Sequence, residues 1–81
     1  MELKDTIEMM NSNDYKERLK AEYYQLKIRI EKLTAMLREY KAGKSKFKPV
    51  CPYELLFEQL IHMKSYMRVL QSCAHIEKLI L

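Results

Sequence analysis

This sequence predicts an all-α fold: an antiparallel two-helix hairpin that resembles a coiled coil, preceded by a short helix. Two long stretches repeat apolar residues at alternating spacings of four and three, which is the heptad pattern of packed helices. The only glycine and both prolines lie between these stretches. The 81 residues form one domain. As a monomer of this size buries only about 60 to 65% of its unfolded surface, we expect a homo-oligomeric helical bundle.

The first two elements are a short helix over residues 2–11 and a long helix over residues 13–41. In the short helix, Leu3, Ile7 and Met10 share one face, which we expect to dock against the longer helices or a neighbouring subunit. Asp14 stands three residues before Glu17, a spacing typical of a helix start. The heptad stripe of the long helix is Leu19, Tyr23, Leu26, Ile30, Leu33, Leu37 and Tyr40.

A basic turn over residues 42–51 leads into a second long helix over residues 52–79. Gly43 fits a left-handed helix cap, and Pro52 fits the first position of the next helix. One stripe of the last helix can meet the preceding helix: Leu56, Leu60, Met63, Met67, Leu70 and Ala74. A second stripe is rotated by about 100°: Tyr66, Val69, Cys73, Ile76 and Ile80. The N-terminal helix, another subunit, or both must cover it.

All of the net charge of +4 comes from one short stretch, residues 38–48. Both flanking regions are neutral, because their acidic and basic residues are equal in number. Alternating lysines around an aromatic residue can present ammonium groups to phosphates while the ring stacks on a base. The candidate ligand-binding residues are Arg38, Lys44, Lys46, Phe47, Lys48 and Tyr53. The alternative is a solvated turn whose lysines only maintain solubility.

Catalytic chemistry has little support in this sequence. His62 and His75 lie 13 positions apart, and no acidic residue is placed to form a triad or a metal cluster with both. Cys51 and Cys73 lack a CxxC spacing and stand beside apolar residues. We therefore expect no enzyme, no metal site and no cofactor.

No stretch has the features of a signal peptide, and the uncharged apolar runs are far shorter than the roughly 20 residues of a membrane span. We therefore expect a soluble protein of a reducing compartment, without membrane contact.

Two stretches carry a resemblance to a known group of proteins: DYKERLKAEYYQLKIRIEKL (14–33) and LLFEQLIHMKSYMRVLQ (55–71). They resemble the two helices of small phage-encoded helical-hairpin proteins related to a crAss-like phage product. The resemblance implies a helical hairpin of viral origin, acting in the cytoplasm of a bacterial host, but no agreed activity. A looser analogy, based on size and architecture, links the chain to phage anti-defence proteins that act as nucleotide sponges.

Two functional hypotheses follow. In the first, an oligomer sequesters a nucleotide second messenger, either a cyclic oligonucleotide or a molecule of the cyclic ADP-ribose type, without cleaving it. In the second, the chain is a protein-interaction module whose apolar helix surface binds a host immune protein. Nonspecific nucleic-acid binding is a weaker interpretation, because five basic residues at one tip give a small footprint.

Overall fold

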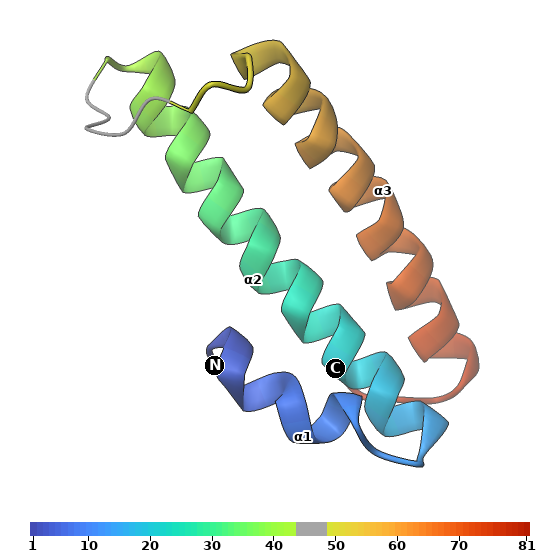
Figure 1. The fold of residues 1–81 in the computed structure, drawn as a ribbon. Coiled ribbons are helices and arrows are strands. Elements are labelled where there is room, and N and C mark those ends of the chain that lie inside the picture. Colours follow the sequence, from blue (N-terminus) through green and yellow to red (C-terminus); the bar gives the residue numbers. More distant parts are fainter. Residues whose placement is uncertain (44–48) are drawn as a thin grey trace.

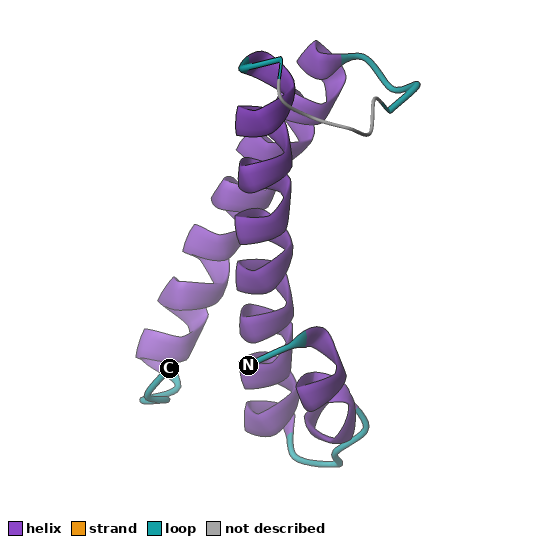
Figure 2. Ribbon diagram, turned by 90° about the vertical axis from the view of Figure 1, so that its left-hand side faces the viewer, coloured by secondary structure: helices purple, strands orange, loops and turns teal. Residues whose placement is uncertain are grey.

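The computed structural model describes residues 1–43 and 49–81, which form four helical elements. These are η1 (Leu3–Thr6), α1 (Ile7–Met10), α2 (Tyr15–Lys41) and α3 (Tyr53–Ile76). The helices α2 and α3 lie side by side and run antiparallel, while α1 lies beside α2 (Figure 1). No strand occurs among the described residues, and the predicted all-α fold is confirmed (Figure 2).

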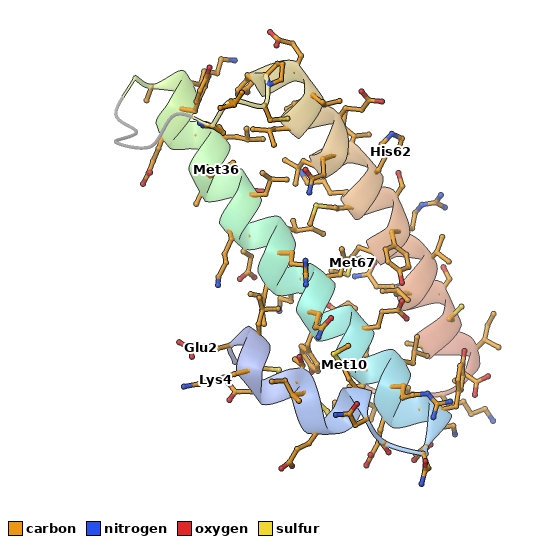
Figure 3. All side chains as sticks on the ribbon, in the orientation of Figure 1. Glu2, Lys4, Met10, Met36, His62 and Met67 are labelled. Atoms are coloured by element: carbon orange, nitrogen blue, oxygen red, sulfur yellow. The ribbon has the colours of Figure 1, made fainter. Side chains whose placement is uncertain are left out.

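The core lies between α2 and α3, where the two predicted heptad stripes face each other. Its buried cluster combines Leu19 and Leu26 of α2 with Leu70 and Ala74 of α3. Further apolar side chains pack against this cluster and are partly buried, among them Tyr23, Ile30, Met63 and Met67. Figure 3 shows Met67 in the space between the two helices. Heptad spacing therefore identified the side chains that join the hairpin.

The start of α2 follows from polar side chains in the segment before it. Asp14 is the N-cap, and its carboxylate accepts a hydrogen bond from the backbone N–H of Lys16 at 3.0 Å. The hydroxyl of Ser12 accepts from the backbone N–H of Asp14 at 3.0 Å. These bonds satisfy groups that a helix end leaves without partners, so α2 begins at Tyr15.

The two long helices end in the same left-handed geometry with different residues. After α2, Gly43 has φ of 71°, and its N–H donates to the carbonyl of Tyr40, as predicted. After α3, Lys78 has φ of 58°, and the N–H of Leu79 donates to the carbonyl of Ala74 at 2.8 Å. The second arrangement is a Schellman motif. It ends α3 at Ile76, three residues before the predicted limit at residue 79.

The N-terminal segment docks on α2 with a face that differs in part from the predicted one. Ile7 and Met10 are 54% and 46% exposed, whereas Thr6 is fully buried. The Thr6 hydroxyl accepts a hydrogen bond from Gln25 Nε2 of α2 at 3.1 Å. Of the expected face, Leu3 is half-buried and the sulfur of Met10 contacts Gln25, whereas Ile7 is exposed. Residues 3–6 form a 3₁₀ turn, which has three residues per turn and rotates the side chains that follow it.

None of the described helices combines the length and the apolar character that crossing a bilayer requires.

Candidate functional site

The end of the hairpin that contains the turn holds an open hollow. The last turn of α2 and the first turn of α3 meet there, because Gly43 ends one helix and Pro52 caps the next. The hollow has a volume of about 460 Å³, is open to solvent, and is lined by Tyr40, Lys41, Pro52, Tyr53 and Glu54. We call it the tip hollow.

Three aromatic rings form a ladder beside the tip hollow. Tyr40 of α2 and Tyr53 of α3 stack with ring centroids 5.7 Å apart and planes 23° apart. Tyr53 also stacks on Phe57, with centroids 6.2 Å apart and planes 18° apart. Tyr53, one of the predicted ligand-binding residues, is the middle ring of the ladder. Phe57, at 46% exposed, offers the more accessible ring.

Basic residues approach the tip hollow from the last turn of α2. Arg38 and Lys41 both lie in this turn and are exposed. Lys41 lines the hollow, whereas Arg38 is not among the lining residues. Glu54 lines the hollow from α3. Its negative charge repels an incoming anion and so offsets part of the attraction by Lys41. The other predicted site residues, Lys44, Lys46, Phe47 and Lys48, lie outside the described residues.

Two rings of the ladder, Tyr40 and Phe57, were not among the predicted site residues. Tyr40 belongs to the heptad stripe of α2 and was expected in the core, but it joins the ladder at the tip. Phe57 lies one turn after Tyr53, so its place beside that ring follows from helical spacing. The i, i+4 relation of Tyr53 and Phe57 was the available signal.

A second groove lies further along the hairpin, between α2 and α3. Its volume is about 280 Å³, and its lining includes two cationic and three apolar side chains. The lining residues are Arg29, Lys32, Leu33, Met36, Gln59 and Met63. Arg29 and Lys32 of α2 therefore border an apolar groove.

The histidine, cysteine and acidic residues of the described part of the chain are spread out. No group of three or more His, Cys, Asp and Glu residues within 1–43 and 49–81 is placed to hold a metal ion. His62 Nε2 lies 3.5 Å from Glu58 Oε1, and both side chains are largely exposed, as the i, i+4 spacing predicts. Cys51 and Cys73 are free, half-buried thiols.

Comparison with known proteins identifies a family whose sequence model covers most of the chain. No curated protein and no solved structure matches the chain. The sequence model of the Sequestin family matches residues 13–73, which include the whole of α2 and most of α3. The matched region contains the tip hollow. Except for Ala74, it also contains the inner stripes, which are the heptad stripes of α2 and α3 that face each other in the core. The chain therefore belongs to the Sequestin family.

Proposed function

We propose that this protein binds and sequesters a nucleotide second messenger, of the cyclic oligonucleotide or cyclic ADP-ribose type, without cleaving it. The observation that carries the proposal is the aromatic ladder of Tyr40, Tyr53 and Phe57 beside a hollow of about 460 Å³. A nucleotide has a planar base and charged phosphates, so it suits a site with exposed rings and neighbouring ammonium groups. The name of the Sequestin family, which indicates sequestration, supports the same role.

In this proposal the base stacks on the accessible face of Phe57, and the phosphates meet cationic groups of the turn. Lys41 lines the hollow, and Arg38 lies one turn before it on α2. Lys44, Lys46 and Lys48 follow directly in the sequence and add three further positive charges. Glu54 at the rim disfavours anions that cannot reach these lysines.

The biological setting that we propose is a phage-encoded anti-defence protein acting as a homo-oligomer in the cytoplasm of its bacterial host. By holding the messenger, such a protein lowers its free concentration and prevents it from reaching an immune effector. A sequestering protein needs affinity and abundance but no reactive group. The proposed role therefore requires only binding at the tip.

Calorimetric titration of the purified protein with cyclic di- and trinucleotides and with cyclic ADP-ribose isomers tests this function. We expect at least one ligand to bind, and chromatography of the ligand released by denaturation to recover it intact. An absence of heat across the whole panel would overturn the proposal. Recovery of a hydrolysed ligand would overturn the claim of sequestration without cleavage.

A matched pair of variants tests the position of the site. Phe57→Ala removes an exposed ring of the ladder, and Ile61→Ala truncates a similarly exposed apolar residue one turn later. Because stacking of a base on an aromatic ring contributes about 1–3 kcal/mol, Phe57→Ala should raise Kd about 5- to 150-fold. Ile61→Ala should leave Kd unchanged. Equal effects of the two substitutions would contradict stacking on Phe57.

The basic turn has its own test. Replacing Lys44, Lys46 and Lys48 together by glutamate should abolish nucleotide binding, because the phosphates then meet three negative charges. Lys64→Glu is the single-site control, since this exposed lysine lies in the middle of α3. Retained binding in the triple variant would show that the turn is only a solvated connection.

A further inference from the structure

A second heptad stripe runs along α3 on a side that the hairpin leaves open. Four of its apolar side chains are largely exposed: Leu55 at 55%, Tyr66 at 43%, Val69 at 51% and Ile76 at 75%. His62, which belongs to the same stripe, points away from α2 (Figure 3). The stripe, which we call the outer stripe, comprises Leu55, Gln59, His62, Tyr66, Val69, Cys73 and Ile76.

The N-terminal helix does not cover the outer stripe. Both η1 and α1 pack against α2 and against each other, and neither packs against α3. The C-terminal tail does not cover it either, because the turn at Lys78 directs Leu79 and Leu81 back to the core. From the sequence, the N-terminal helix, another subunit, or both could cover this surface. Among the described residues the N-terminal helix does not cover it, so another subunit remains.

We propose that two copies of this chain pair their α3 helices antiparallel along the outer stripe. The stripe has spacings of 4, 3, 4, 3, 4 and 3, a heptad repeat sustained over three heptads, which is typical of a helix that packs against another helix. A self-complementary patch on one helix produces an isologous, two-fold dimer that closes without further growth.

The antiparallel register is defined by the spacing of the stripe. A two-fold axis between Tyr66 and Val69 places each of these residues opposite the other in the second copy. The same axis places His62 opposite Cys73, and Gln59 opposite Ile76. All three pairs lie at matched heights, because the sequence distances from the axis are equal within each pair.

Charge supports the antiparallel direction over the parallel one. The first two turns of α3 carry two acidic residues, Glu54 and Glu58. Antiparallel pairing places these glutamates of the two copies at opposite ends of the dimer, and it also opposes the two helix dipoles. Parallel pairing would bring the glutamates of the two copies together. An interface of a single helix pair is small, so we expect Kd on the order of micromolar.

The dimer also affects the ligand site, a step that rests on the proposed function. Antiparallel α3 helices place the two tip hollows at opposite ends of the dimer, about 44 Å apart, because Tyr53 precedes the axis by 14.5 residues in each copy. Each hollow then has the end of the second copy's α3 near it. Two independent ligands per dimer are expected, in contrast to a single pocket shared by joined tips.

Cysteine crosslinking tests the interface and its direction without any ligand. In a Cys51→Ser background, His62→Cys should yield a covalent dimer on mild oxidation, with mass spectrometry showing linkage between position 62 and Cys73. The link cannot form within one chain, because 11 residues of helix span about 16 Å, and a disulfide needs Cα atoms within about 7 Å. Lys64→Cys in the same background, which faces off the stripe, should give no such link.

Three outcomes of crosslinking would overturn the proposal. Linkage of Cys73 to Cys73 in the Cys51→Ser chain would show parallel pairing. Equal dimer yields from His62→Cys and Lys64→Cys would show random collision. A chain that dimerises in solution but gives no link between positions 62 and 73 would have its interface on another face.

Sedimentation equilibrium across a concentration series gives an independent test. The native chain should dimerise, and Val69→Glu should raise the dimer Kd at least about tenfold, because a carboxylate would enter the apolar stripe. Ile61→Glu is the matched control, since Ile61 is 48% exposed on α3 but lies off the outer stripe. Circular dichroism checks that both variants remain helical. A monomeric native chain, or equal effects of both variants, would overturn the proposal.

Discussion

The inner and outer stripes of α3 have the same heptad spacing and opposite environments. Leu70 on the inner stripe is 4% exposed, whereas its sequence neighbour Val69 on the outer stripe is 51% exposed. Both stripes are apolar enough to pack against a helix, but α2 presents only one matching surface. The comparison shows that periodicity predicts which residues can pack against another helix. The number of neighbouring helices decides which of these residues are buried within the chain.

The strongest test of this comparison is the substitution Leu70→Ala. It should lower the free energy of unfolding by about 2–5 kcal/mol, because it removes buried methyl groups and leaves a cavity in the core cluster. Urea denaturation followed by circular dichroism measures the loss. A loss below about 1 kcal/mol would contradict the placement of Leu70 in the core.

A smaller and opposite effect is expected just after Ile76, the last residue of both α3 and the outer stripe. Lys78→Gly should raise the free energy of unfolding by about 0.5–1 kcal/mol, since glycine avoids the steric cost of φ at 58° but loses more chain entropy on folding. Thermal unfolding detects this gain as a higher Tm. Lys64→Gly, inside α3, should instead lower Tm.

The smallest effect is expected for Val69→Ala at concentrations where the chain is monomeric. The free energy of unfolding should change by less than about 0.5 kcal/mol, because an exposed side chain loses little burial. The same denaturation assay used for Leu70→Ala measures it, so the two neighbours form a matched pair. A loss comparable with that of Leu70→Ala would mean that Val69 is covered within a single chain.

Much of the hairpin was predictable from local patterns. The stripe from Leu19 to Leu37 and the stripe from Leu60 to Ala74 meet in the core as the heptad spacing indicated. Gly43 caps α2 as expected, because the left-handed conformation is readily adopted by glycine. The cap at Lys78 was not predicted, because nothing in a lysine side chain indicates a left-handed turn.

The candidate site was predicted less completely than the fold. The sequence pattern predicted a ligand site at the tip that includes Tyr53, and Tyr53 lines the tip hollow. It did not indicate that Tyr53 stacks between Tyr40 and Phe57, because that contact depends on how the ends of two helices meet. The buried hydrogen bond between Thr6 and Gln25 was unpredictable in the same way, since 19 positions separate its partners.

The sequence by itself determined the helical class, the inner stripes, the glycine cap and the concentration of positive charge near the turn. These properties depend on residues within a few positions of one another, so spacing and side-chain chemistry suffice to predict them. Only the tertiary structure decided that the N-terminal segment covers α2, that three rings form a ladder at the tip, and that the outer stripe stays open. Those features depend on which surfaces the chain brings together, and local periodicity does not contain that choice.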